Sequence, residues 1–286
     1  MPVKTIGILG AGSMGRGIAQ LAAQSGFEVI LSDLTLDIVE RALEDVKKQL
    51  SRLVEKGKMT QADQEAILAR IKKASGLESL APADFVIEAV FEDENLKKEI
   101  FQKLDSLCPP EVILTSNTSS ISITALAAAT GRPAQVAGMH FFNPAPVMRL
   151  VEVIRGYLTS DATVAAVMEV ARKMNKTPIE VKKDSPGFVV NRIMLAQFIE
   201  AIKLLEEGVA SIEDIDTAVK LGLNYPMGPF ELMDFTGVDI GYHTLNYLCE
   251  EFKEGRWNPP VSLKLLIKAG RLGKKTGAGW YDYEKN

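Results

Sequence analysis

Residues 3–33 read VKTIGILGAGSMGRGIAQLAAQSGFEVILSD, and this stretch decides the fold. A β-rich apolar run leads into a glycine-rich turn, a helical pattern follows as far as Gly26, and a second apolar run ends at Asp33. The turn has the G-x-G-x-x-G spacing of a dinucleotide-binding βαβ unit. The N-terminus of the helix presents unpaired N–H groups to a pyrophosphate. The sequence therefore predicts a nucleotide-binding strand–turn–helix–strand unit.

The glycines of the turn each have a physical role in this motif. Gly10 allows the sharp turn, Gly12 lets the backbone approach the pyrophosphate, and Gly15 lets the helix pack closely on the strand. An ordinary tight turn is the alternative interpretation, but the flanking strands, the helix and a later acidic residue all agree with nucleotide binding. The predicted cofactor loop comprises Gly10, Gly12, Ser13, Met14 and Gly15.

The choice of dinucleotide depends on Asp33. It follows Gly10 by about 20 residues, the spacing at which an acidic side chain meets the adenosine ribose hydroxyls. Because a carboxylate there repels a 2′-phosphate, we predict NAD(H) as the cofactor, with NADP(H) less favoured.

Length and composition exclude several function classes. At 286 residues the chain exceeds one typical domain, and 47% hydrophobic with 24% charged residues is ordinary for a well-packed protein. A net charge of −4 provides no basic surface for nucleic acid, and no apolar run reaches the ~20 residues of a membrane span. Cys108 and Cys249 are far apart and suit a reducing cytosol better than a disulfide framework or a zinc site. With no sign of a signal peptide, we expect a cytoplasmic protein without nucleic-acid or membrane partners.

Two consecutive helices are predicted after the nucleotide-binding unit. A helical pattern runs from Thr35 to about Lys56 and ends at Gly57, and Thr60 caps a second helix that we expect to reach about Lys73. Such a pair is an insertion into the regular alternation of strands and helices in a βαβ fold. It is either a solvated helical arm or a basic patch for an anionic substrate handle. Its tip carries Ser51, Arg52, Lys56 and Lys58.

The rest of the chain changes character near residue 184. Further strands are predicted at 84–90, 112–115, 136–142, 147–154 and 179–181, with helices at 95–107 and 161–174. The later patterns are helical, at 188–207, 212–221, 229–234, 238–251 and 261–269. The predicted fold class is α/β, a Rossmann-type doubly wound, mostly parallel sheet with a helical-hairpin insertion. It occupies an NAD-binding domain, 1–184, which an all-helical C-terminal domain, 185–286, follows.

One of the two histidines has the surroundings of an acid–base group. His140 lies in an apolar stretch, and Glu152 lies on the next predicted strand. A carboxylate hydrogen-bonded to imidazole fixes its tautomer and stabilises the imidazolium. A satisfied core histidine is the usual alternative, but the nucleotide site and a glutamate within an apolar strand favour catalysis. We interpret His243, which lacks such neighbours, as structural.

Ser119 and Asn191 are further candidates, because a hydroxyl and an amide can hydrogen-bond a carbonyl oxygen. Ser119 follows a predicted strand, at the sheet edge where doubly wound folds bind their ligands. The alternative interpretations are a helix cap for Ser119 and a first-turn polar residue for Asn191. The pair Asn143-Pro144 is first of all a turn signal.

Five motifs in order give the chain a resemblance that covers nearly its whole length. GAGSMGRGIA, SNTSS, HFFNPAPVMRLVEV, DSPGFVVNR and GKKTGAGWYDY are similar to those of the 3-hydroxyacyl-CoA dehydrogenase family. The single-function length and the SRLVEKGK arm most resemble the bacterial 3-hydroxybutyryl-CoA dehydrogenases. The resemblance implies reversible, NADH-dependent reduction of acetoacetyl-CoA to (S)-3-hydroxybutyryl-CoA by hydride transfer.

The resemblance also implies roles for individual residues. His140 corresponds to the catalytic acid/base and Glu152 to its partner, while Ser119 and Asn191 correspond to contacts of the reacting acyl group. The cofactor contacts that it implies outside the glycine loop are Asp33, Glu92, Lys97, Ser119, Asn143 and Lys275.

Charged residues of the arm and the C-terminus complete the implied site. Lys56 corresponds to a coenzyme A contact. Arg52 stands where lysine is expected, which keeps the positive charge but changes the donor geometry. Lys274, next to Lys275, leaves the register of the C-terminal contact open.

The family is commonly dimeric through its helical domain, so we expect a homodimer. Apolar residues there suit packing between subunits, among them Leu223, Tyr225, Met227, Phe230, Leu232 and Phe235. Three alternatives stay open: a dehydrogenase of a longer 3-hydroxyacyl-CoA, one of a non-CoA hydroxy or sugar acid, and a non-catalytic structural relative. The presence of His140, Glu152, Ser119 and Asn191 argues against the last.

Overall fold

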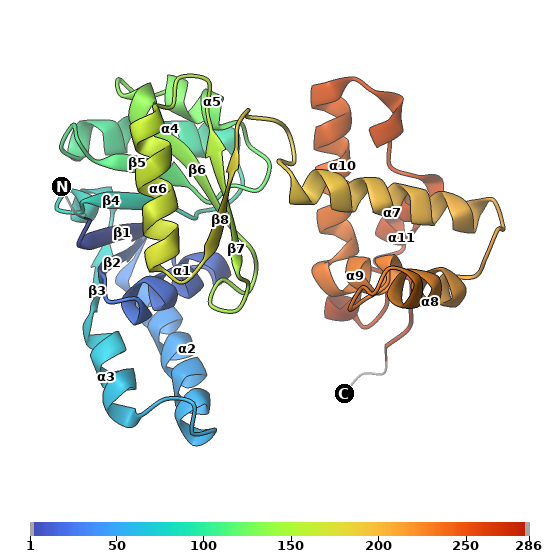
Figure 1. Cartoon of the computed structure of the whole chain (residues 1–286), viewed down its shortest axis with the longest axis horizontal. Coiled ribbons are helices and arrows are strands. Elements are labelled where there is room, and N and C mark those ends of the chain that lie inside the picture. Colours follow the sequence, from blue (N-terminus) through green and yellow to red (C-terminus); the bar gives the residue numbers. More distant parts are fainter. Residues whose placement is uncertain (1–2, 284–286) are drawn as a thin grey trace. The chain divides into compact units, whose positions relative to one another are not determined.

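The chain folds as two compact units. The computed structural model describes residues 3–283, and its units are Met1–Ser185 and Pro186–Asn286 (Figure 1). The boundary predicted at residue 184 lies beside this division. Each unit has its own hydrophobic core.

The first unit is built on a single sheet. Within residues 3–283 this sheet has eight strands, in the order β3-β2-β1-β4-β5-β6-β7-β8. Neighbouring strands run parallel, except that β6 and β7 pair antiparallel. The doubly wound, mostly parallel fold predicted from the sequence is confirmed. The strands are β1 Thr5–Leu9, β2 Glu28–Asp33, β3 Ile71–Ser75, β4 Phe85–Glu88, β5 Ile113–Ser116, β6 Val136–Phe141, β7 Leu150–Arg155 and β8 Thr177–Val181.

Helices cover both faces of this sheet (Figure 1). Ile6 and Ile8 of β1 are fully buried and share a core with Ile18 and Val39 on one face, and α4 and α5 lie on the other. Burial of each such side chain contributes about 1.5–3 kcal/mol, so the strand that precedes the glycine turn is firmly held. The helices are α1 Ser13–Gln24, α2 Leu36–Glu55, α3 Gln61–Ala69, α4 Glu94–Leu107, α5 Ile123–Ala128 and α6 Asp161–Lys173.

The predicted helical-hairpin insertion is formed by α2 and α3, which lie side by side and extend away from the sheet (Figure 1). Gly57 has φ +63°, as expected of a glycine just after a helix. Thr60 and Asp63 cap α3 reciprocally, the Asp63 N–H donating to the Thr60 hydroxyl at 3.1 Å. Both turn signals were therefore correctly interpreted.

The predicted extent of the second arm helix was wrong. It ends at Ala69, and Ile71–Ser75 form β3, which pairs with β2 at the edge of the sheet. Only Ile71 and Ala74 of this strand are buried, whereas Lys72 and Lys73 face solvent. Charged residues are tolerated on an edge strand, and here they extended a helix-like pattern past the true helix end.

The second unit is helical, as predicted. Its core contains Phe230, Leu248 and Trp257. Phe230 is fully buried, so its expected place in an apolar surface was wrong, while Leu223 and Phe235 are exposed. Across residues 3–283, none of the helices combines the length and apolar character that a membrane crossing requires. The helices are α7 Val190–Glu206, α8 Ile212–Gly222, α9 Pro229–Thr236, α10 Val238–Phe252 and α11 Val261–Lys268.

Candidate active site

The turn after β1 has the backbone of a nucleotide-binding loop. Gly10 has φ +98° and donates its N–H to the carbonyl of Ser32 at 2.8 Å, a left-handed conformation that favours glycine. A Cβ atom on Gly10 would lie 2.5 Å from the carbonyl oxygen of Ala89, and one on Gly15 would lie 1.8 Å from that of Gly10. The protein's own backbone therefore excludes a side chain at both positions.

Gly12 is needed for a different reason. Among the residues that the structure describes, nothing lies within 4 Å of a Cβ atom built on Gly12, and Gly12 and Ser13 are exposed. Gly12 is also the N-cap of α1, and within 3–283 no side chain caps this helix end. Orphan N–H groups beside open space suit an anion. The loop therefore fits a dinucleotide pyrophosphate.

Asp33 is fixed beside this loop at the end of β2. One carboxylate oxygen accepts the N–H of Ala11 at 2.6 Å, and the other accepts the N–H of Leu34 at 2.7 Å. The side chain is thus held at the carboxyl edge of the sheet, as a ribose-binding carboxylate requires.

His140 and Glu152 form a buried pair. They lie directly opposite each other in the antiparallel ladder of β6 and β7, so their side chains share one face of the sheet. Nδ1 of His140 lies 2.8 Å from Oε2 of Glu152. His140 is 5% exposed and Glu152 is fully buried. The carboxylate orients the ring so that Nε2 is the nitrogen turned away from it, an arrangement suited to proton transfer.

The His140 strand is tied to its neighbours at the same edge of the sheet. Asn117 donates its N–H to the carbonyl of Glu88 at 2.8 Å, and its Oδ1 accepts the N–H of Phe141 at 2.9 Å. Because β1, β4, β5 and β6 are parallel, the glycine loop and the His140 pair lie at one carboxyl edge. The strand order reverses between β1 and β4, the position where doubly wound folds bind ligands.

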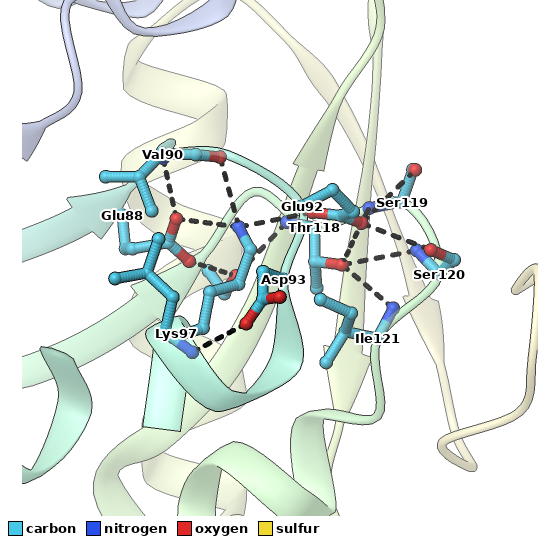
Figure 2. Close-up of polar contacts among 11 residues, drawn as sticks. Glu88, Val90, Glu92, Asp93, Lys97, Thr118, Ser119, Ser120 and Ile121 are labelled. Carbon is cyan, nitrogen blue, oxygen red and sulfur yellow. Dashed lines mark hydrogen bonds and ion pairs between the residues drawn. The ribbon is translucent and has the colours of Figure 1, made fainter. Parts of the chain in front are cut away.

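A hydrogen-bonded cluster (Figure 2) lies at the ends of β4 and β5, the two strands between β1 and β6 in the sheet. Glu88, the last residue of β4, accepts a hydrogen bond from Lys97 of α4 at 2.7 Å. Nζ of Lys97 also lies 3.2 Å from Oε2 of Glu92. Glu92 in turn accepts hydrogen bonds from the Thr118 hydroxyl and, at 3.0 Å, from the N–H of Ser119. The predicted contacts Glu92, Lys97 and Ser119 are thus brought together.

Glu92 is the carboxylate of this cluster that reaches the surface, with a side chain 38% exposed. Burial of the rest of the group raises its pKa, but the Lys97 ammonium and hydrogen bonds from Thr118 and Ser119 together hold the pKa of Glu92 below its usual value. A stable negative charge therefore faces the sheet edge beside Ser119.

Sequence reasoning missed the inner members of the cluster. Glu88 and Ser116 are fully buried, and Thr118 is almost so. The available signal was an acidic residue at the end of an apolar strand, the same feature that identified Glu152. The helix-cap alternative for Ser119 is excluded, because Ser122 caps α5 by accepting the N–H of Ala125 at 3.2 Å.

Asn143 is exposed in the loop after β6, and its bond to Pro144 is cis. The buried Lys176 holds this loop by donating to the carbonyls of Ala145 and Met148, both at 2.7 Å. Burial lowers the pKa of the Lys176 ammonium. Lys176 is a further residue that the sequence analysis missed, and it supports the position of a predicted cofactor contact.

The remaining predicted residues lie elsewhere. Arg52, in the last turn of α2, and Lys56, its C-cap, are both exposed on the arm. Asn191 belongs to the second unit, in the first turn of α7. Lys275 also belongs there and lies 2.6 Å from a carboxylate oxygen of Asp239, whereas Lys274 lies over aromatic rings.

Comparison with known proteins identifies the family of both units. Residues 5–185 match the NAD-binding domain of 3-hydroxyacyl-CoA dehydrogenase, and residues 187–283 match its C-terminal domain. The chain belongs to the 3-hydroxyacyl-CoA dehydrogenase family. The resemblance inferred from the five sequence motifs is confirmed.

Three relatives illustrate the degree of similarity. A Bacillus subtilis protein named "Probable 3-hydroxybutyryl-CoA dehydrogenase" is 49% identical, over 100% of this chain and 99% of its own. The 3-hydroxybutyryl-CoA dehydrogenase of Clostridioides difficile is 44% identical, over 98% of this chain and 99% of its own. The crystal structure of (S)-3-hydroxybutyryl-CoA dehydrogenase from Ralstonia eutropha has a TM-score of 0.96 and 46% identity, and the match covers 99% of this chain and 100% of that one.

Proposed function

We propose that this protein is a 3-hydroxybutyryl-CoA dehydrogenase, which catalyses the reversible reduction of acetoacetyl-CoA to (S)-3-hydroxybutyryl-CoA with NADH. The observation that carries the proposal is the buried His140–Glu152 pair, 2.8 Å apart at the same sheet edge as the glycine loop. The names of the similar proteins from Clostridioides difficile and Ralstonia eutropha support the choice of substrate.

The cofactor is held by the glycine loop and α1 through its pyrophosphate, and by Asp33 through its adenosine ribose. Glu92, Lys97, Ser119 and Asn143 complete the binding surface of the first unit, and Lys275 that of the second. Bound NADH supplies the hydride that adds to C3 of the acyl chain. The Asp33 carboxylate favours NADH over NADPH because it repels a 2′-phosphate.

His140 transfers a proton between Nε2 and the oxygen on C3 of the substrate. Glu152, at Nδ1, orients the ring and stabilises the positive charge that develops on it. The Ser119 hydroxyl hydrogen-bonds the same oxygen, and the Asn191 amide is the other proposed contact of the acyl group. Loss of one such donor costs about 2.7–4 kcal/mol in well-studied oxyanion sites.

The substrate's coenzyme A moiety is bound by the helical arm. Arg52 and Lys56 are exposed there, and their positive charges suit the phosphates of a coenzyme A ester. We also propose a homodimer, which the exposed apolar side chains of Leu223 and Phe235 on the second unit support. The free thiols of Cys108 and Cys249 support a cytoplasmic location.

Steady-state kinetics test this proposal. The purified protein is assayed with acetoacetyl-CoA, with a longer 3-ketoacyl-CoA and with free acetoacetate, each with NADH and with NADPH. We expect the highest kcat/KM with acetoacetyl-CoA and NADH. Preferential turnover of free acetoacetate would instead indicate a dehydrogenase of non-CoA acids, and binding of NADH without turnover of any substrate would indicate a non-catalytic relative.

A further inference from the structure

The loop that carries Ser119 is held in place by Glu88, a side chain that is itself buried and does not reach the protein surface. Glu88 is fully buried, and three donors satisfy its carboxylate. One oxygen accepts from Lys97 and from the N–H of Val90, both at 2.7 Å, and the other accepts the Ser116 hydroxyl at 2.6 Å. One side chain thus joins the ends of β4 and β5 to the first turns of α4 (Figure 2).

The first route from Glu88 to Ser119 is electrostatic. Lys97 is 1% exposed and lies between two carboxylates, Glu88 at 2.7 Å and Glu92 at 3.2 Å. Glu92 then contacts the Ser119 N–H at 3.0 Å and its hydroxyl at 3.5 Å. Removal of one carboxylate leaves the charge of this buried ammonium partly uncompensated, which favours a shift of Lys97 toward its remaining partners. Displacement of Lys97 therefore displaces Glu92 and the loop that Glu92 holds.

The second route follows the backbone. The Ser116 hydroxyl, which donates to Glu88, accepts the N–H of Thr118 at 3.1 Å. The Thr118 hydroxyl in turn accepts the N–H groups of Ser120 at 3.2 Å and Ile121 at 2.9 Å. Both routes end at the turn that carries Ser119, so Glu88 sets its position from two directions.

We propose that Glu88 is a positioning residue of the active site, which holds Lys97 and Ser116 and through them fixes Ser119 at the sheet edge. The proposal rests on the function proposed above, in which Ser119 contacts the reacting group. Glu88 itself is buried beneath the loop and acts only through these neighbours.

A double-mutant cycle between Glu88 and Ser119 tests the proposal. Glu88→Gln keeps the shape of the side chain but removes its charge, and we expect kcat/KM for acetoacetyl-CoA to fall about 10–100-fold. With both backgrounds assayed at saturating NADH, so that displacement of Lys97 and Glu92 does not enter through cofactor binding, the same change in a Ser119→Ala background should cost less than about threefold, because the group that Glu88 positions is already gone. An equal loss in both backgrounds would mean a general structural role and would overturn the proposal, as would full activity of Glu88→Gln.

Asp105→Asn is the matched control. Asp105 lies on the same helix as Lys97 and forms an ion pair with Arg132 at 2.6 Å. Its replacement removes a partly buried, ion-paired carboxylate from the other end of α4. We expect a lower Tm but a kcat/KM within about twofold of the unchanged protein. If Asp105→Asn lowers kcat/KM as much as Glu88→Gln, the effect of Glu88 is not specific and the proposal fails.

A crystal structure of Glu88→Gln gives a readout independent of turnover. We expect the contact between Glu92 and Ser119 to be lost while His140 and Glu152 stay paired; an unmoved Ser119 loop would overturn the proposal. If Glu88→Gln does not fold, Glu88→Asp keeps the buried charge but is one methylene shorter, and the same cycle and structure apply to it. Absence of turnover by the unchanged protein would count against the proposed function instead, and the crystallographic comparison would still decide the role of Glu88.

Discussion

The His140 pair and the Ser119 loop lie at the same edge of one sheet but are held there in different ways. His140 and Glu152 occupy opposite positions of the β6–β7 ladder, so backbone hydrogen bonds set their separation. Ser119 lies in a loop, and the side chains of Glu92 and Thr118, with Lys97 and Glu88 behind them, hold it (Figure 2).

This difference determines what a substitution reports. A group placed by a strand ladder keeps its position when a neighbouring side chain changes, so substitution of the pair reports chemistry. A group placed by buried charges moves when one of them is removed, because an unpaired buried ion is costly. Substitutions around Ser119 therefore report position as well as chemistry.

Replacement of His140 by Gln should have the largest effect. Gln cannot transfer the proton, so we expect kcat to fall about 10²–10⁴-fold. The β6–β7 ladder should stay intact and the affinity for NADH should be nearly unchanged, while the Tm should fall because the buried Glu152 carboxylate loses its imidazole partner. Steady-state rates, thermal unfolding and NADH fluorescence titration measure the three quantities. Parallel loss of turnover and NADH binding would show that His140 is structural. Substitution of the His140 pair would then report position as well as chemistry, as it does for the Ser119 loop.

The glycine loop extends the comparison to a region set by backbone contacts. Gly15→Ala places a methyl group against the Gly10 carbonyl oxygen, and we expect it to destabilise the protein by about 1–3 kcal/mol and to weaken NADH binding strongly.

The methyl group of Gly12→Ala meets no described atom within 4 Å, so the Tm of this variant should be unchanged. Its Kd for NADH should still rise about tenfold, since the methyl group occupies the space of the pyrophosphate. Unaltered NADH affinity of Gly12→Ala would indicate that the cofactor does not bind at this loop.

The His140 pair and the Ser119 loop also differ in how much of each could be predicted from the sequence. The glycine loop follows from local spacing, and the His140 pair was found because each residue interrupts an apolar strand and the strands follow each other. The role of Glu88, which supports the Ser119 loop, depends on its contacts with Lys97 and Ser116. These two residues lie on other elements of the fold, so no regular spacing in the sequence indicates that they meet Glu88. The edge strand β3 was missed for a local reason, since Lys72 and Lys73 hid its two buried positions.

Asp33→Ala should have a moderate effect, confined to cofactor choice. The carboxylate is held by backbone N–H groups of Ala11 and Leu34, so it belongs with the backbone-placed groups. Its loss removes the repulsion of a 2′-phosphate, and we expect the ratio of kcat/KM for NADH over NADPH to fall about tenfold. Glu40→Ala, which removes an exposed carboxylate of α2 paired with Lys73, is the control and should leave the ratio unchanged. An unchanged ratio in Asp33→Ala would exclude Asp33 from the ribose site.

The pH dependence of stability should give the smallest effect. It reports on the Ser119 loop alone, because that loop is held by charged side chains. The pKa of Glu92 is below its ordinary value of 4.5 in the folded protein, because Lys97 and the Ser119 loop outweigh the effect of burial. A lowered folded pKa means that the unfolded chain binds the proton more readily, so the carboxylate's contribution to stability is complete above the unfolded pKa. It is lost as the pH falls below 4.5 and through the folded pKa.

Thermal unfolding of the unchanged protein and of Glu92→Gln between about pH 3 and pH 7 measures this contribution. We expect the unchanged protein to have the higher Tm at neutral pH, and the difference to shrink as the pH falls through the acidic range. A difference for Glu92→Gln that is constant across this range would mean that the Ser119 loop is held by shape rather than by charge. The contrast between the two regions would then disappear.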